Sequence, residues 1–248
     1  MTDRTPLIAG NWKMNLSKSE ALALASDLVR WTKDHGETIE MLVCPPATLI
    51  HPVWKVIDDT PVRLGGQDCH MVDWGAHTGD ISAPMLKDMM CQYVIVGHSE
   101  RRANHGESSS RVACKASNAI INGLIPIICV GETEADREAG RAEEVVGQQL
   151  SESIPEGLAA DQFAIAYEPV WAIGTGKTAT LEDVAAMHAF IREHEEDRET
   201  ADALRILYGG SVKPSNAAEI IGLTDVDGVL VGGASLKSED FIGIAEAA

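Results

Sequence analysis

The sequence predicts a closed (β/α)₈ barrel, an α/β fold in which eight parallel strands are surrounded by helices. Short apolar runs occur eight times, and each is followed by polar or glycine-rich residues and then by a helical pattern. The runs begin about 32 residues apart on average, close to the size of one βα unit. Alternating strands and helices indicate a parallel sheet. Eight units within 248 residues favour a closed barrel over an open doubly wound sheet, which remains the alternative.

The eight apolar runs are typical of strands that are buried on both faces. In chain order they are Leu7–Gly10, Met41–Cys44, Val62–Gly65, Tyr93–Gly97, Ile125–Val130, Phe163–Tyr167, Arg205–Tyr208 and Gly228–Val231. No Ser- or Pro-rich linker separates them, so we expect residues 1–248 to form a single barrel domain.

The first helix begins with a capping box of Ser17 and Glu20, followed by an apolar stripe from Ala21 onward. A later helix opens at Thr180 and carries His188 on its apolar face, so we expect this histidine to pack in the core. The other expected helices are Arg111–Asn122, Thr133–Ser153, Ser215–Ile221 and Ser238–Ala245, and the acidic tract His194–Glu199 is expected on a solvated helix face.

The chain is acidic, with 38 Asp and Glu against 20 Lys and Arg and a formal charge of −18. This charge argues against a nucleic-acid partner, because a polyanion needs a basic surface, and against an anionic membrane surface. Five scattered cysteines without a C-x-x-C pair favour reduced thiols. We expect neither a signal peptide, because Asp3 and Arg4 precede only a very short apolar run, nor a membrane span, because no apolar stretch is long enough. We therefore expect a soluble, cytoplasmic protein.

Polar side chains follow several of the predicted strands, at the face where a barrel of this kind carries its active site. Asn11 and Lys13 follow the first strand, His98 and Glu100 the fourth, and Glu168 the sixth. Each has an ordinary alternative: a solvated lysine, a hydrogen-bonded strand-end histidine, a carboxylate paired with an arginine. Their joint occurrence at strand ends favours a catalytic site.

Glycines follow the last two strands, in Gly209-Gly210-Ser211 and Gly232-Gly233, and each group leads into a short helical segment. Backbone N–H groups at such positions form an anion cradle, and the loops after strands seven and eight recurrently bind phosphate in barrels. The alternative is that these glycines only form tight turns. The pattern favours phosphate binding.

One loop has the composition of a hinged lid. It begins at a stiff proline, contains two glycines and reads Pro169, Val170, Trp171, Ala172, Ile173, Gly174, Thr175, Gly176, Lys177, Thr178 and Ala179. The Gly-Lys-Thr in it is not a P-loop, because that motif needs glycine where Trp171 stands. No histidine or cysteine spacing matches a zinc site, so we expect no metal.

The same motifs resemble the triosephosphate isomerase family along nearly the whole chain, a family of TIM barrels. The matching stretches are Gly10–Asn15, Gly97–Arg102, Cys129–Thr133, Ala166–Thr180, Tyr208–Val212 and Asp227–Leu236, in the family's order. The resemblance implies an aldose–ketose isomerase of glycolysis and gluconeogenesis. Such an enzyme interconverts dihydroxyacetone phosphate and D-glyceraldehyde 3-phosphate through an enediolate, without cofactor or metal.

The resemblance also implies a role for each catalytic residue. Glu168 matches the base that moves a carbon-bound proton, and His98 matches a neutral imidazole that polarises the carbonyl. Lys13 supplies positive charge and Asn11 helps to position the substrate. Glu100 matches the partner of Lys13. Ser99 matches the residue that holds the base when the site is open.

The remaining implied roles concern the phosphate, the lid and the dimer. The phosphate site matches the N–H groups of Gly174, Ser211, Gly232 and Gly233. An apolar clamp over the carboxylate matches Ile173 and Leu230. The latch of the closed lid matches Tyr208. Family members are homodimers in which the loop after the third strand inserts beside the partner's site. The loop Gln67–Gly79 corresponds to this inserted loop. Thr78 matches the residue that reaches the partner's Asn11. The runs Ser108–Ser110 and Val72–Trp74 look less typical, which leaves the interface detail open.

Three alternatives to this function remain. A methylglyoxal synthase-like lyase would use the same substrate and a similar base, but it would not need the intact lid. A Schiff-base aldolase would use Lys13 as its nucleophile. A non-catalytic phosphate-binding barrel would give no reason for Asn11, Lys13, His98 and Glu168 to occur together.

Overall fold

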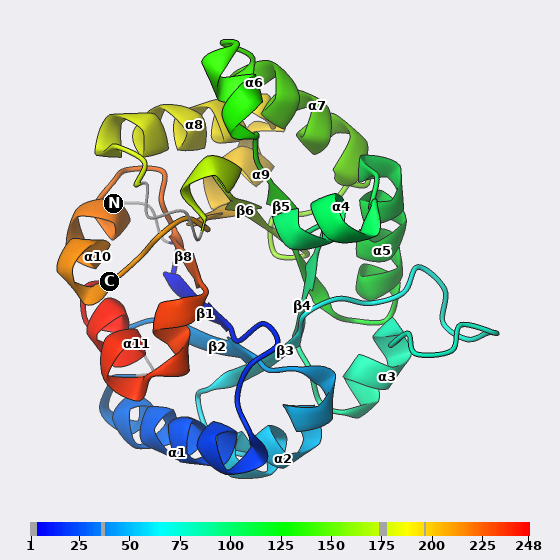
Figure 1. The fold of residues 1–248 in the computed structure, drawn as a ribbon, viewed down its shortest axis with the longest axis vertical. Coiled ribbons are helices and arrows are strands. Elements are labelled where there is room, and N and C mark those ends of the chain that lie inside the picture. Colours follow the sequence, from blue (N-terminus) through cyan, green and yellow to red (C-terminus); the bar gives the residue numbers. More distant parts are fainter. Residues whose placement is uncertain (1–3, 36–37, 174–177, 196) are drawn as a thin grey trace.

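The computed structural model describes residues 4–35, 38–173, 178–195 and 197–248, and its strands close into a barrel (Figure 1). Neighbouring strands are parallel all the way round, and the eighth strand pairs with the first. The predicted (β/α)₈ barrel is therefore confirmed and the open doubly wound sheet is excluded. The strands are β1 (Leu7–Asn11), β2 (Glu40–Cys44), β3 (Arg63–Gly66), β4 (Tyr93–Val96), β5 (Ile125–Val130), β6 (Ala164–Tyr167), β7 (Arg205–Tyr208) and β8 (Gly228–Val231).

Helices surround the strands in Figure 1. The α-helices are α1 (Lys18–His35), α2 (Ala47–Ile57), α3 (Ala83–Asp88), α4 (Ser99–His105), α5 (Ser109–Ile121), α6 (Glu134–Glu138), α7 (Ala142–Ser153), α8 (Leu181–His194), α9 (Arg198–Ala203), α10 (Pro214–Ile221) and α11 (Ser238–Ala245). Two 3₁₀ helices, η1 (Val170–Ala172) and η2 (Gly233–Leu236), follow β6 and β8. Among the described residues, no helix is both long and apolar enough to cross a membrane.

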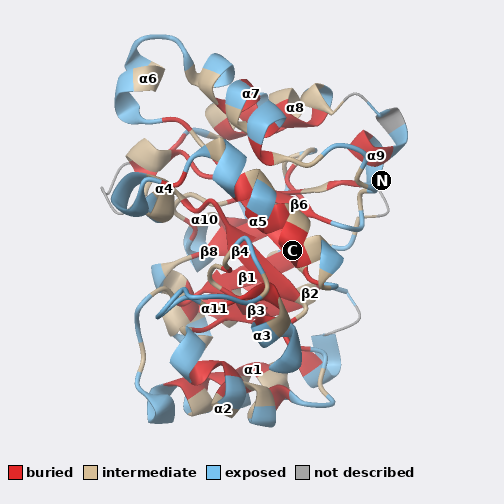
Figure 2. Ribbon diagram, turned by 90° about the vertical axis from the view of Figure 1, so that its right-hand side faces the viewer, coloured by how far each residue is buried: buried red, intermediate tan, exposed pale blue. Residues whose placement is uncertain are grey.

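The strands are apolar except at some of their end residues, because both of their faces are buried (Figure 2). Leu7 and Ala9 of β1 belong to an apolar cluster that strand residues alone make up, which places it inside the barrel. The side chain between them, Ile8, belongs to a larger cluster that includes helix residues. Successive side chains of a strand point to opposite faces, so one strand contributes to both clusters.

The predicted helix Thr133–Ser153 is wrong as a single element, because the chain forms α6 and α7 with a break between them. Gly140 lies in this break with a φ of +69°, a left-handed conformation that suits glycine and ends a helix. The acidic tract His194–Glu199 is also not one helix face: α8 ends at His194 and α9 begins at Arg198, with residue 196 outside the described residues. The capping box is confirmed, since Glu20 accepts the Ser17 N–H at 2.8 Å.

His188 packs in the core, as its position on the apolar face of the helix predicts. Its Nδ1 donates to the Asp225 carbonyl at 2.9 Å, and its buried Nε2 has no hydrogen-bond partner among the described residues. Burial lowers the pKa of His188 to about 4, so the ring is neutral at pH 7. All the cysteines are unpaired, and Cys114 alone of the five is exposed.

Candidate active site

A cavity of about 390 Å³ opens at the carboxyl ends of the strands. It brings together the predicted residues Asn11, Lys13, His98, Glu100, Glu168, Ile173, Ser211, Leu230, Gly232 and Gly233. These residues come from β1, β8 and the segments that follow β1, β4, β6, β7 and β8. The wall also contains Lys213, a second lysine at the mouth that the sequence interpretation did not single out. A signal for Lys213 was present in the sequence, because it is a cation only two residues after Ser211, on the segment after the seventh strand.

Glu168 comes directly after β6, and its carboxylate is almost completely buried, with 2% of the side chain exposed. One carboxylate oxygen, Oε2, accepts the backbone N–H of Ser99 at 2.8 Å. The other, Oε1, lies 2.8 Å from Nε2 of His98. Ser99 therefore holds the carboxylate through its backbone, and its hydroxyl is not needed for this contact.

His98 sits at the N-cap of α4, where its side chain satisfies a backbone donor of the helix. The N–H of Glu100 donates to His98 Nδ1 at 3.2 Å. Because Nδ1 acts as acceptor, the proton of the neutral ring is on Nε2. The short α4 helix thus fixes the ring so that its N–H points at the carboxylate of Glu168.

Lys13 adopts a left-handed backbone conformation, with a φ of +50°. This conformation costs about 1–3 kcal/mol in a residue with a side chain, and neighbouring groups must hold it. Asn11 Oδ1 accepts the Lys13 N–H at 3.0 Å, and Gln67 Nε2 donates to the Lys13 carbonyl at 2.7 Å. Gln67 was not predicted as a site residue, although it follows β3 at the same face of the barrel.

The Lys13 ammonium donates to Glu100 Oε1 at 2.5 Å. Partial burial alone would raise the pKa of Glu100, but the hydrogen bond and the charge of Lys13 outweigh burial and lower that pKa. Glu100 is therefore ionised at neutral pH, and it keeps the cation at the mouth of the cavity.

Backbone groups suited to an anion lie beside Lys13. A Cβ added at Gly232 would lie 3.3 Å from Cε of Lys13, so this glycine is in contact with the lysine stem. Gly233 opens the 3₁₀ helix η2, and Ser211 lies three residues before α10. Helix starts leave N–H groups free to bind anions. Gly174, the fourth predicted member of the anion site, lies outside the described residues.

The predicted lid is described at both ends, over Pro169–Ile173 and Thr178–Ala179, while residues 174–177 lie outside the described residues. At its first turn, Trp171 Nε1 donates to Glu132 Oε1 at 2.8 Å, and the Arg137 guanidinium lies 4.7 Å from the centre of the indole ring. The Tyr208 hydroxyl is buried and has no hydrogen-bond partner among the described residues. Burial raises the pKa of Tyr208 to about 12, so this hydroxyl stays protonated.

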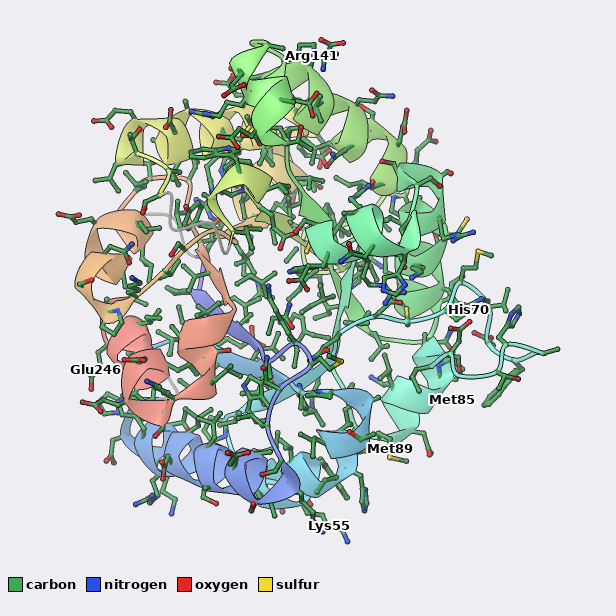
Figure 3. The ribbon with its side chains drawn as sticks, in the orientation of Figure 1. Lys55, His70, Met85, Met89, Arg141 and Glu246 are labelled. Atoms are coloured by element: carbon green, nitrogen blue, oxygen red, sulfur yellow. The ribbon has the colours of Figure 1, made fainter. Side chains whose placement is uncertain are left out.

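Thr78 is not brought to this cavity within one chain. It is exposed on the segment between β3 and α3, which projects from the ring of helices (Figure 1). On the same segment, His70 (Figure 3), His77 and Asp80 place one potential metal-ligand atom each within 4.8 Å of the others. The Val72 N–H donates to His70 Nδ1, which leaves the ring proton on Nε2, 3.6 Å from Asp80 Oδ2. His70, His77 and Asp80 could hold a metal ion, and the expectation of no metal stays a prediction.

The cavity thus combines a buried carboxylate, an imidazole N–H aimed at it, a cation and backbone N–H groups near helix starts. A carboxylate and a donor on either side of a substrate can remove a proton next to a carbonyl and stabilise the resulting enediolate. The cation and the backbone groups suit an anionic substrate. The arrangement supports proton transfer on a phosphorylated carbonyl compound.

Comparison with known proteins agrees with this chemistry. A family model described as "Triosephosphate isomerase" matches residues 6–248. Proteins named triosephosphate isomerase from Afipia carboxidovorans and Acidiphilium cryptum are 54% and 55% identical to the chain; the alignments cover 98% of this chain in both cases and 97% and 98% of those proteins. The crystal structure of triosephosphate isomerase from Bartonella henselae superposes with a TM-score of 0.91 at 43% identity, covering 98% of each chain. The chain therefore belongs to the triosephosphate isomerase family.

Proposed function

We propose that the protein interconverts dihydroxyacetone phosphate and D-glyceraldehyde 3-phosphate by proton transfer through an enediolate. The observation that supports this most is the pairing of Glu168 and His98. These two side chains follow different strands, and their functional atoms lie 2.8 Å apart in one cavity with Lys13. The chemistry needs no metal or cofactor, because side chains perform every proton transfer.

Glu168 is the proposed base. Its carboxylate removes a proton from the carbon next to the carbonyl and returns it to the neighbouring carbon. A substrate whose reacting carbons lie between Glu168 and His98 replaces the contact between these two side chains. The Ser99 N–H holds the carboxylate until the substrate is bound.

His98 is the proposed electrophile. With its proton on Nε2, the ring donates a hydrogen bond to the substrate oxygen on which charge develops, and it passes protons between the two enediolate oxygens. The Glu100 N–H that donates to Nδ1 keeps the ring in this tautomer. Such preorganised donors act most strongly in a buried site, where water does not compete.

The phosphate is proposed to bind the N–H groups of Ser211, Gly232 and Gly233, with Gly174 completing the site. Lys13 lies next to Gly232 and adds the charge that a dianion needs in a molecule with a net charge of −18. Attraction is thus local to the mouth. The lid from Pro169 to Ala179, with the clamp of Ile173 and Leu230 and the latch at Tyr208, keeps water from the enediolate, which would otherwise lose phosphate.

A coupled assay of isomerisation tests the proposal against the lyase alternative. We expect glyceraldehyde 3-phosphate as the main product of dihydroxyacetone phosphate, with methylglyoxal at the level of the uncatalysed reaction. Methylglyoxal and inorganic phosphate as main products would instead indicate the lyase. The Schiff-base alternative is disfavoured because the Lys13 ammonium donates a hydrogen bond to Glu100 at 2.5 Å, and an ammonium group is not a nucleophile. Borohydride trapping with substrate is expected to leave Lys13 unlabelled.

We further propose that residues 1–248 form one catalytic barrel that works as a homodimer in the cytoplasm. Large apolar side chains are exposed on the projecting segment Gln67–Gly79 and on the helix that follows it: Trp74 (69% exposed) is on the segment and Met85 (44%) is on α3. Met14, between β1 and α1, is 93% exposed. Met85 lies beside this projecting segment in Figure 3. Exposed apolar side chains that gather in this way are typical of a protein–protein interface.

Introducing a charge at the tip of the segment is expected to separate the dimer. Sedimentation velocity should give a dimer for the wild type and a monomer for Trp74→Glu, because a buried carboxylate in an apolar interface lacks a partner. The exposed Ala139, after α6, supplies the control Ala139→Glu, which should stay dimeric. A wild-type monomer with full activity would contradict the proposed dimer.

A further inference from the structure

The segment Val130–Glu132, which begins at the last residue of β5, holds the backbone around Glu168. The Glu168 N–H donates to the Val130 carbonyl at 2.7 Å, and the Val170 N–H donates to the Glu132 carbonyl at 3.2 Å. Between these two contacts, Gly131 lies directly against the Glu168 carbonyl, since a Cβ at position 131 would be 1.8 Å from that oxygen. A shift of Gly131 therefore moves the peptide that carries the carboxylate.

A side chain from an outer helix fixes Gly131. Gln149 of α7 accepts the Gly131 N–H through Oε1 at 2.8 Å and donates from Nε2 to the Gly131 carbonyl at 3.0 Å. One side-chain amide thus binds both the N–H and the carbonyl of Gly131, as the backbone of a neighbouring strand would. A cavity of about 260 Å³ is lined by Gly131, Gln149 and Glu168, so the peptide has room to shift once this clamp is released.

We propose that Gln149 is a positioning residue for the catalytic base, which it holds in place through the backbone of Gly131. Gln149 does not line the substrate cavity, so it acts on the reaction only through Glu168. This inference rests on the proposed role of Glu168. A misplacement of about 1 Å in a reacting group can cost about 10²-fold in rate, and the clamp prevents such a displacement.

The neighbouring residue offers a matched control. Gln148 is exposed on the same helix and donates to Glu152 at 2.8 Å, away from β5 and β6. Gln149→Met and Gln148→Met remove the same amide and keep the length of the side chain. We expect kcat to fall about tenfold or more in Gln149→Met and to stay at the wild-type value in Gln148→Met, at temperatures well below the Tm of each variant.

The binding of inorganic phosphate separates positioning from general damage. Three of the four residues of the proposed phosphate site, Ser211, Gly232 and Gly233, lie on the segments after β7 and β8, away from the clamp at Gly131. The inhibition constant of inorganic phosphate should therefore stay close to the wild-type value in Gln149→Met. A lower Tm with unchanged kcat would reduce Gln149 to a structural role and overturn the inference. A loss of phosphate binding in parallel with kcat would overturn it as well.

A second variant covers the case in which Gln149→Met does not fold. Gln149→Glu keeps the acceptor for the Gly131 N–H, but its carboxylate cannot donate to the Gly131 carbonyl. We expect its kcat to lie below the wild-type value, with phosphate inhibition unchanged; wild-type kcat in this variant would contradict the inference. An inactive wild-type protein would instead refute the proposed function, so the two failures are distinguishable.

Discussion

Replacing Glu168 by alanine is expected to lower kcat by about 10⁴-fold, because the variant has no base to move the carbon-bound proton. The fold should persist, since the backbone N–H of residue 168 still donates to Val130. Inorganic phosphate should inhibit the variant as it does the wild type. Coupled kinetics at saturating substrate, together with the circular dichroism spectrum and the Tm, measure these effects.

A shorter carboxylate provides the matched comparison. Glu168→Asp keeps the charge and withdraws the carboxylate by one methylene, so it should retain more activity than Glu168→Ala and still lose about 10²-fold. Equal activity in the two variants would mean that the carboxylate has no catalytic role. Near-wild-type turnover in Glu168→Ala would overturn the assignment of the base.

Replacing His98 by asparagine is expected to lower kcat by about 10²–10³-fold, the typical cost of losing one preorganised donor to a developing oxyanion. Asparagine is a good N-cap residue, so it can still accept the Glu100 N–H and preserve the start of α4. The Tm should therefore stay close to that of the wild type. What is lost is the N–H that reaches the substrate oxygen.

His105, at the end of the same helix, is exposed and gives the control His105→Asn. This variant should have wild-type kcat. A kcat for His98→Asn equal to that of the control would show that the imidazole does not take part in the reaction. A large fall in Tm for His98→Asn would instead point to an N-cap role that asparagine does not fill.

The strands were predictable because parallel strands covered on both faces consist almost entirely of apolar residues. All eight expected runs form strands, and their bounds differ from the expected ones by one residue at most. The position of Glu168 after β6 and His98 after β4 then places both side chains at one face, whatever the details of the loops. This is why spacing alone indicated a common site.

The contacts that hold these residues were not predictable. Gln149 lies 18 residues after Gly131, on the same face of α7 as the buried Val146. Its place in the helical period separates it from the exposed Gln148, but it does not show that the amide meets Gly131. Gln67 likewise reads as an ordinary loop residue until β1 and β3 are brought together. Such hydrogen bonds depend on the packing of distant elements, which apolar periodicity does not encode.

The resemblance to a known family implied that Ser99 holds the base, but it did not say whether the backbone or the hydroxyl of Ser99 makes the contact. The carboxylate of Glu168 accepts a hydrogen bond from the Ser99 backbone, a contact that residue type alone does not specify. The helix expected over Thr133–Ser153 was wrong for a related reason. A single glycine inside a helical pattern is tolerated in many helices, and the left-handed φ of Gly140 is a property of the folded chain.

The central claim is that Glu168 and His98 move a carbon-bound proton through an enediolate that is protected from losing phosphate. The most direct measurement is the reaction of dihydroxyacetone phosphate in D₂O, followed by proton NMR. We predict glyceraldehyde 3-phosphate as the product, with methylglyoxal and inorganic phosphate at background. The carbon next to the aldehyde should carry deuterium in those molecules that form after the Glu168 proton has exchanged with solvent. Methylglyoxal and inorganic phosphate as the main products, or no turnover by a folded protein, would contradict the account.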